Sequence, residues 1–318
     1  MATGLDWLGY GAIRALEPAI RRLPARAVEP LGLAAGAVAY HLARTRARWG
    51  RANIRIAFPD AERREVGRIV RKSFGHMAIG ALDLVRASRW SDAELRERVE
   101  LVGLKHAESE IERGKGLFLV SAHIGNFELM IRRFALEGHP MLVLGRPLKN
   151  ARLYDRIRKL RTELGEIRVV DSRKNAGVPI YRAIRRGQVV GMLTDQRVKR
   201  RVGAFVPLFG IRCVTSTTAP EFALARDTGV IFATISRRGA DRHVVEFSEP
   251  LTFERSGDAE ADAAAGAARL NRQLEARIRA HPEQWLCGTR RFRRSPDLPV
   301  DPYAPGAPED FPLPPSQG

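Results

Sequence analysis

Runs of apolar residues alternate with amphipathic segments through the middle of the chain, from residue 99 to residue 247. Short uninterrupted apolar runs predict buried strands, and segments whose apolar residues recur every three or four positions predict helices. The expected strands are residues 99–102, 116–122, 141–144, 167–170, 188–193, 230–236 and 243–247, the last two paired. The expected helices between them are residues 105–113, 127–136, 151–164, 177–186 and 220–226. This alternation is typical of an α/β protein, so we predict a mixed central sheet flanked by helices.

The segments outside this alternation predict helices, a loop and a tail. Residues 60–85 predict a helix, and Ser91 to Glu94 form a capping box that opens a shorter one. Residues 259–280 predict a long alanine-rich helix, whereas proline and glycine interrupt residues 197–212 and predict a loop. Eight prolines fall in residues 295–318, so we predict an extended or disordered strap that forms no core element. The expected apolar stripe of the first helix is Phe74, Met77, Ile79 and Leu82.

The first 58 residues combine apolar and basic blocks in a way that is typical of helices at a membrane surface. The longest uncharged run, residues 31–43, has 13 residues and falls short of the roughly 20 that a bilayer-spanning helix needs. Arginines flank this run, among them Arg48 and Arg51 on its C-terminal side. We predict that the segment forms helices that lie on, or dip into, an anionic membrane surface. A soluble helical hairpin that caps the main domain is the alternative. The expected parts of the chain are residues 1–58, a main domain of residues 59–294 and a tail of residues 295–318.

Charge narrows the classes of partner. The chain has 54 basic and 36 acidic residues, and its net charge is +18. Arginine dominates the basic set and suits phosphate and carboxylate groups, so nucleic acid, anionic lipid or an acidic protein are candidate partners. No nucleic-acid-binding motif is present. The two cysteines, Cys213 and Cys287, match no metal-ligand spacing and indicate a reduced, intracellular protein.

One histidine follows a predicted strand at the kind of position where α/β folds place their ligands. The expected strand 116–122 runs into His123, and Glu128 follows in the first turn of the next expected helix. On one continuous helix their spacing would turn the two side chains about 140° apart, but a strand-to-helix junction lets imidazole and carboxylate meet. A carboxylate that orients a neutral imidazole makes a general-base site. The alternative is a histidine that satisfies a loop carbonyl and a glutamate on a solvated helix face.

Other polar groups follow expected strands at the same rim of the sheet. Arg146 comes after the third expected strand, and Asp195 with Gln196 comes after the fifth. Ligands of open α/β sheets bind at the carboxyl ends of strands, so we expect these groups near His123. The chain has no phosphate-binding glycine loop, dinucleotide fingerprint, metal-ligand cluster or Gly-x-Ser-x-Gly elbow. We therefore expect no cofactor, no metal and no serine nucleophile.

The sequence of residues 121–128, Ser-Ala-His-Ile-Gly-Asn-Phe-Glu, resembles the His-x4-Asp/Glu signature of the glycerolipid acyltransferases. More narrowly, the chain resembles the bacterial lipid A biosynthesis acyltransferases of the lauroyl and myristoyl type, which also include mycobacterial phosphatidylinositol mannoside acyltransferases. The further matching stretches are residues 53–59, Arg146-Pro147, Arg161 with Gly165, residues 194–196, Phe209-Gly210, residues 281–285 and residues 290–292. The resemblance covers residues 1–294. It fails at Cys287-Gly288-Thr289, where such proteins more often have an aromatic residue and a histidine.

The resemblance implies a glycerolipid acyltransferase-like fold and transfer of an acyl chain from a thioester to a hydroxyl of a lipid acceptor. His123 would be the general base and Glu128 its orienter, without an acyl-enzyme. Arg146 or Arg161 would stabilise the oxyanion. The residues expected to position the acceptor or shape the site are Asp195 and Gln196. The candidates for an apolar acyl slot are Phe127, Met130, Phe205 and Phe209, with core packing as the alternative for each.

The resemblance also implies partners and a location. The expected donor is acyl carrier protein or acyl-CoA, and the expected acceptor is an anionic lipid, a lipid A precursor or a related glycolipid. The expected location is the cytoplasmic face of the bacterial inner membrane. Basic clusters at residues 152–159 and 197–201 are candidate docking surfaces, with a solvated basic face as the alternative. We expect no nucleic-acid partner, and a non-enzymatic protein that binds nucleic acid or lipid is the alternative function.

Overall fold

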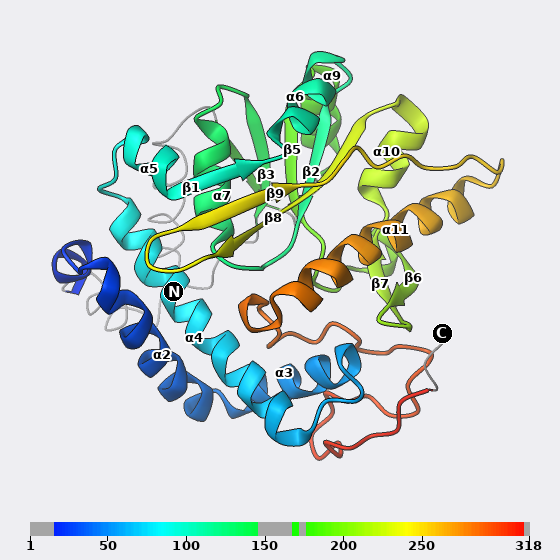
Figure 1. Ribbon diagram of the computed structural model, residues 1–318. Coiled ribbons are helices and arrows are strands. Elements are labelled where there is room, and N and C mark those ends of the chain that lie inside the picture. Colours follow the sequence, from blue (N-terminus) through cyan, green and yellow to red (C-terminus); the bar gives the residue numbers. More distant parts are fainter. Residues whose placement is uncertain (1–15, 146–166, 172–175, 315–318) are drawn as a thin grey trace, which may run out of the picture.

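A seven-stranded sheet forms the centre of the part of the molecule that the structure describes (Figure 1). The structure is a computed structural model and describes residues 16–145, 167–171 and 176–314. The strand order is β1-β9-β8-β2-β5-β3-β4, and neighbours are parallel except β8 and β9. The strands are β1 Val99–Val102, β2 Leu117–Ser121, β3 Met141–Gly145, β4 Ile167–Asp171, β5 Val189–Leu193, β8 Gly229–Arg237 and β9 His243–Phe247. The predicted mixed sheet and the predicted pairing of the last two strands are confirmed.

Helices cover both faces of the sheet, which is why its central strands are continuous apolar runs. All five residues of β2 are buried, and alternate ones join different clusters of buried side chains. Phe118 and Val120 join one cluster, and Leu117 and Leu119 join the other. Helices that contribute to the first cluster include α9 Gly177–Arg185, α10 Thr218–Arg226 and α11 Ala259–Ala280. Those that contribute to the second include α5 Asp92–Arg98, α6 Leu104–Glu112 and α7 Phe127–Ala135.

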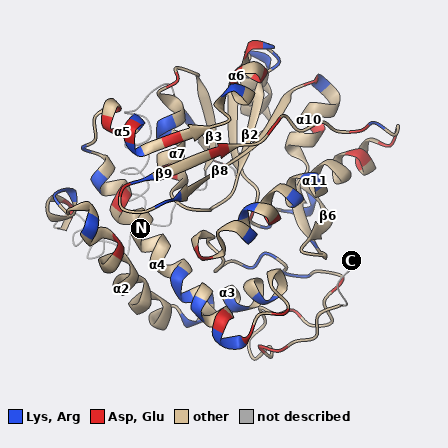
Figure 2. Ribbon diagram, in the orientation of Figure 1, with Lys and Arg blue, Asp and Glu red and all other residues tan. Residues whose placement is uncertain are grey.

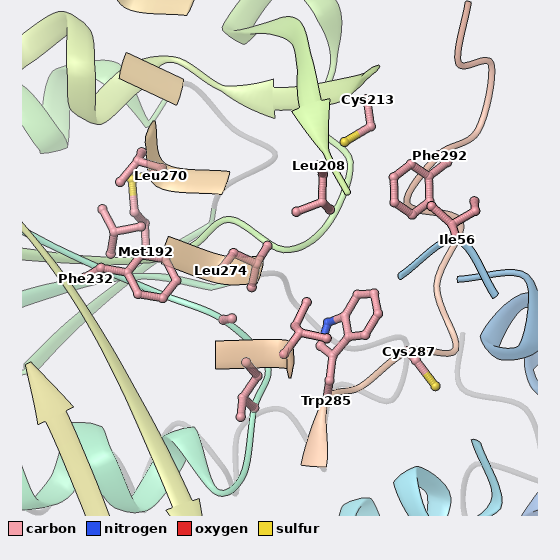
Figure 3. Close-up of a cluster of buried hydrophobic side chains, with 14 of the residues drawn as sticks. Ile56, Met192, Leu208, Cys213, Phe232, Leu270, Leu274, Trp285, Cys287 and Phe292 are labelled. Carbon is pink, nitrogen blue, oxygen red and sulfur yellow. The ribbon is translucent and has the colours of Figure 1, made fainter. Parts of the chain in front are cut away.

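Figure 3 shows part of the first cluster, where side chains of the sheet meet α11. Met192 of β5 and Phe232 of β8 lie against Leu270 and Leu274 of α11. Trp285 follows η2 (Pro282–Gln284), the short helix after α11, and its side chain is fully buried in the same cluster. The core thus extends from the sheet to the segment that closes the main domain.

The N-terminal part forms helices that pack on one another through glycines. The helices are α2 Ala25–Leu42, α3 Arg44–Ala57 and α4 Arg63–Ala87. A Cβ atom on Gly36 would lie 2.3 Å from the backbone nitrogen of Gly75, so α2 and α4 touch through their backbones. The predicted apolar stripe of α4 is wrong at Met77, whose side chain is 48% exposed. The face of α4 that packs against Gly32 of α2 carries Ile79 instead. No helix among the described residues has the length and apolar content needed to cross a bilayer.

The predicted loop 197–212 is wrong, because most of it forms a β-hairpin. After the short helix η1 (Arg200–Val202), β6 (Gly203–Leu208) pairs antiparallel with β7 (Ile211–Ser216). Phe209 and Gly210 both have positive φ, as the two central residues of a type I′ hairpin turn require. Proline in β6 is tolerated because the described part of this sheet has only two strands, so each strand has a free edge.

The tail contributes to the core, contrary to the sequence-based prediction. Residues 295–314 form no helix or strand, but Leu298, Tyr303 and Phe311 are buried in the first cluster. The Tyr303 hydroxyl donates to Asn53 Oδ1 over 2.5 Å and accepts from the Phe292 N–H over 2.9 Å. The tail is therefore an extended strap that three buried side chains fix to the protein.

Candidate active site

His123 lies in the loop between β2 and α7, and its backbone is held on both sides by the segment after α11. The His123 carbonyl accepts from the Leu286 N–H over 2.9 Å, and the Gly125 N–H donates to the Gln284 carbonyl over 3.0 Å. Gly125 has φ of 58°, and a Cβ there would lie 2.2 Å from the Ile235 carbonyl oxygen. Only glycine fits this turn, which aims the His123 side chain at the rim of the sheet.

Asp195 is hydrogen-bonded to His123. The two residues follow β2 and β5, which are parallel neighbours, so both lie at the same rim as predicted. Asp195 Oδ1 lies 2.7 Å from His123 Nδ1, and Trp285 Nε1 donates to Asp195 Oδ2 over 3.2 Å. Asp195 is fully buried, whereas 20% of the His123 side chain is exposed. Burial alone would raise the pKa of Asp195, but the charge and hydrogen bond of His123, with the Trp285 bond, lower it below its usual value.

This geometry determines what the imidazole can do. An ionised Asp195 accepts a hydrogen bond, so it favours the tautomer that carries its hydrogen on Nδ1. Nε2 is then the nitrogen that can take a proton. Gln196 Nε2 lies 3.4 Å from each ring nitrogen, and the ring centroids of Phe127 and His123 are 5.0 Å apart with the rings nearly perpendicular. The ring is therefore restrained by its neighbours and basic at one nitrogen.

Glu128 lies in the first turn of α7, as predicted. The side chain of Asn126 caps this helix by accepting from the Leu129 N–H over 3.3 Å. Glu128 is half-buried. The carboxylate at Nδ1 of His123 belongs to Asp195, so a role of Glu128 as orienter stays a prediction. Arg146 and Arg161 lie outside the described residues.

Comparison with known proteins identifies the kind of chemistry. The family described as "Bacterial lipid A biosynthesis acyltransferase" matches residues 1–294. The chain belongs to this family. It is 27% identical over 301 residues to the "Lipid A biosynthesis lauroyltransferase" of Escherichia coli (strain K12), and 26% identical over 293 residues to the "Lipid A biosynthesis palmitoleoyltransferase" of the same organism. Each alignment covers 92% of both chains. The protein is thus an acyltransferase, and the resemblance inferred from the sequence is confirmed.

Two residues support the geometry around His123 although the sequence suggested no role for them. Trp285 forms an isolated antiparallel bridge with Ile124 and hydrogen-bonds Asp195. Gln284 Oε1 accepts from the Arg237 N–H over 2.8 Å, and Gln284 Nε2 donates to the Arg237 carbonyl over 3.1 Å. Both lie in the His-Pro-Glu-Gln-Trp stretch that contributed to the resemblance. Their contacts are long-range, so no local pattern could have assigned them.

The structure separates the four candidates for an acyl slot. Phe127 lies beside the His123 ring. Met130 is 2% exposed in the second cluster, which is the core-packing alternative. Phe205 stacks under the Arg200 guanidinium, and Phe209 packs near Phe58. Within the described residues, no group of three histidine, cysteine or acidic side chains is arranged to hold a metal ion.

The unusual Cys287-Gly288-Thr289 stretch packs against α3 and α4. Cys287 is buried, and its Sγ donates to Ser73 Oγ over 3.5 Å. Asn53 Nδ2 donates to the carbonyls of Cys287 and Thr289 over 2.5 and 2.7 Å. Cys213 and Cys287 are both free thiols. Burial raises the pKa of Cys287 to about 11, so this thiol is inert at neutral pH.

Proposed function

We propose that this protein moves a fatty acyl chain from an acyl thioester to a hydroxyl of a lipid A precursor or a related glycolipid. The donor is acyl carrier protein or acyl-CoA, and the place of reaction is the cytoplasmic face of the inner membrane. The observation that carries the proposal is the 2.7 Å contact between Asp195 and His123 in a chain of this family. The names of the two relatives support the lipid A precursor as acceptor.

In the proposed reaction His123 is the general base. Asp195 keeps the hydrogen on Nδ1, so Nε2 accepts the proton of the acceptor hydroxyl as its oxygen attacks the thioester carbonyl. A tetrahedral oxyanion forms, and Arg146 or Arg161 is our candidate for stabilising it. The carbon–sulfur bond then breaks, and the protonated His123 returns its proton to the leaving thiolate. The products are an ester and a free thiol, and no acyl-enzyme is required.

Two carboxylates then compete for the role of orienter. Asp195 is hydrogen-bonded to the ring, and Glu128 is the carboxylate of the His-x4-Glu signature. Gln196 would limit movement of the ring or position the acceptor. Loss of the residue that fixes the tautomer costs up to about 10⁴-fold in rate in a related base-and-orienter pair. The rate of acyl transfer by variants of each residue therefore distinguishes the role of Asp195 from that of Glu128.

Acyl transfer by substituted enzymes tests this mechanism. His123→Ala should abolish transfer of a labelled chain to a lipid A precursor, and Asp195→Asn should lower kcat by at least about 100-fold because the tautomer is no longer enforced. The kcat of Glu128→Gln is measured in the same assay. A loss of kcat comparable to that of Asp195→Asn would indicate that Glu128 also orients His123. Arg186→Gln on the opposite end of the sheet is the control and should keep wild-type activity. Unchanged transfer by His123→Ala would disprove the mechanism.

The acceptor is identified in the cell. Deletion of the gene should produce a lipid species that lacks one acyl chain, detected by mass spectrometry of total lipids. The wild-type gene should restore the complete species, and the His123→Ala gene should not. An unchanged lipid profile in the deletion strain would count against a lipid acceptor.

A further inference from the structure

Four arginines from two distant segments lie near one another, and we name them the arginine cluster. Its members are Arg197, Arg290, Arg293 and Arg294. Arg197 directly follows Gln196, whose Nε2 lies 3.4 Å from both ring nitrogens of His123. The other three follow Trp285, whose indole donates to Asp195. Both segments that carry the cluster therefore contact the catalytic histidine or its partner.

The members act on one another through their charges. Burial lowers the pKa of Arg197, and the neighbouring charges of Arg293, Arg294 and Arg290 lower it further. Among the described residues, no carboxylate contributes to this shift. Arg197 Nε is buried and has no hydrogen-bond partner in the described part of the chain. The cluster is a concentration of positive charge with an unpartnered N–H of Arg197, the residue after Gln196.

Two buried residues fix the segment that presents this charge. Arg291 is fully buried and donates to the Val214 carbonyl over 2.8 Å and to Thr215 Oγ1 over 2.7 Å. Phe292 is also fully buried, and its N–H donates to the Tyr303 hydroxyl. Thus the run of residues 290–294 has an anchored pair in its middle, with more exposed arginines on either side.

The flanking arginines are themselves restrained. The Arg290 guanidinium lies 5.0 Å from the centroid of the Trp49 ring, a cation–π arrangement. Arg294 has φ of 58°, a conformation that costs free energy for a residue with a side chain. Packing therefore holds like charges together where repulsion alone would separate them. A bound anion would offset that repulsion.

We propose that the arginine cluster binds a phosphate group of a substrate and holds that substrate with its reacting group at His123. Guanidinium groups match phosphate oxygens through paired, charge-assisted hydrogen bonds. Several guanidinium groups together suit a multiply charged phosphate better than they suit a single, singly charged carboxylate. Two substrates of the proposed function could supply the phosphate: a phosphorylated acceptor lipid, or the phosphodiester of the phosphopantetheine arm of the donor. The identity of the substrate that carries the phosphate rests on the proposed function. Binding of a phosphate group by the cluster does not.

Direct binding tests the anion site without acyl transfer. Inorganic phosphate is titrated into the full-length protein at constant ionic strength, with tryptophan fluorescence as the signal because Arg290 lies over Trp49. Arg197→Gln and Arg293→Gln should each weaken binding by about tenfold or more, on the scale of a lost charge-assisted hydrogen bond. Arg186 is the exposed C-cap residue of α9, and Arg186→Gln should match the wild type within about twofold. Equal affinity of all four proteins, or no saturable binding by the wild type, would overturn the proposal.

Kinetics distinguish the two sources of the phosphate. If the acceptor supplies it, Arg293→Gln should raise the KM of the phosphorylated acceptor about tenfold and leave that of the dephosphorylated acceptor unchanged. If the donor supplies it, the same contrast should appear between acyl-phosphopantetheine and acyl-pantetheine. A KM that rises equally with and without the phosphate would contradict both. A wild type that binds phosphate yet transfers no acyl chain would refute the proposed function and leave the anion site standing.

Discussion

At the scale of single residues, the same physical effect shifts two neighbouring groups in opposite directions. Burial lowers the pKa of His243 from its usual 6.5 to about 3, and the charge of Arg237 adds to this. Burial raises the pKa of Asp83 from 3.8 to about 6, against the charge of Arg237. His243 Nε2 and Asp83 Oδ2 are 3.7 Å apart, and Asp83 also pairs with Arg237. These groups join α4 to the β8–β9 hairpin.

The free energy of unfolding should depend on pH through His243. A lowered folded-state pKa contributes stability that is present above pH 6.5 and is lost as the pH falls toward 3. Asp83 has the opposite sign, since its raised pKa contributes stability that is lost as the pH rises through 6. His243→Gln removes only the first contribution. We expect urea denaturation to show the variant gaining about 2 kcal/mol relative to the wild type between pH 7.5 and pH 5. A difference that is the same at both pH values would contradict this.

At the scale of elements, one face of α2 packs against α4 and the other face is exposed. Its buried face, with Gly32 and Gly36, packs on α4. Its other face is apolar and exposed: Leu31 is 50%, Val38 60% and Leu42 80% exposed. Seven- and four-residue spacings put these three on one side of the helix. An exposed apolar side with arginines at both ends fits a helix that lies in the surface of an anionic membrane.

Charged residues on that face should weaken membrane binding. We expect the double variant Val38→Glu and Leu42→Glu to bind phosphatidylglycerol vesicles at least about tenfold more weakly in sedimentation, since each buried apolar side chain is worth about 1.5–3 kcal/mol. The fold should persist, because both side chains are exposed. Val178→Glu on α9 replaces a side chain of similar exposure, 49%, and should bind like the wild type. If the double variant also binds like the wild type, α2 is not the membrane-binding element.

At the scale of the whole molecule, the tail joins α3 to the hairpin and the core. Basic residues along α3, visible in Figure 2, contact it. Arg48 Nη1 donates to the Ala304 carbonyl over 2.6 Å, and Arg51 pairs with Glu309 at 2.5 Å. Arg212 of β7 pairs with Asp297 at 2.5 Å. Arginines next to the predicted membrane helix therefore also hold residues 295–314 in place.

Loss of one anchor should destabilise the whole protein. Phe311 is 1% exposed, with the Arg55 guanidinium 4.9 Å from its ring centroid. Phe311→Ala should lower the free energy of unfolding by about 3 kcal/mol through lost burial and a residual cavity. Val300→Ala, at an exposed site of the same tail, should cost less than about 0.5 kcal/mol. Equal denaturation midpoints for the two variants would show that the tail is not part of the cooperative unit.

The sequence by itself determined most of the elements and placed His123 in the loop after β2. Apolar periodicity and capping residues are local, so strands such as β2 and the helix after His123 followed from the order of residues alone. Contacts between distant segments were decided only by the tertiary structure. Asp195 reaches His123 across 72 residues because β2 and β5 are neighbours, and Phe311 is buried because the tail folds back onto the first cluster of buried side chains. Such contacts form only when hydrophobic burial packs distant segments against one another. The arginine cluster also joins distant segments, so the order of residues alone could not reveal it.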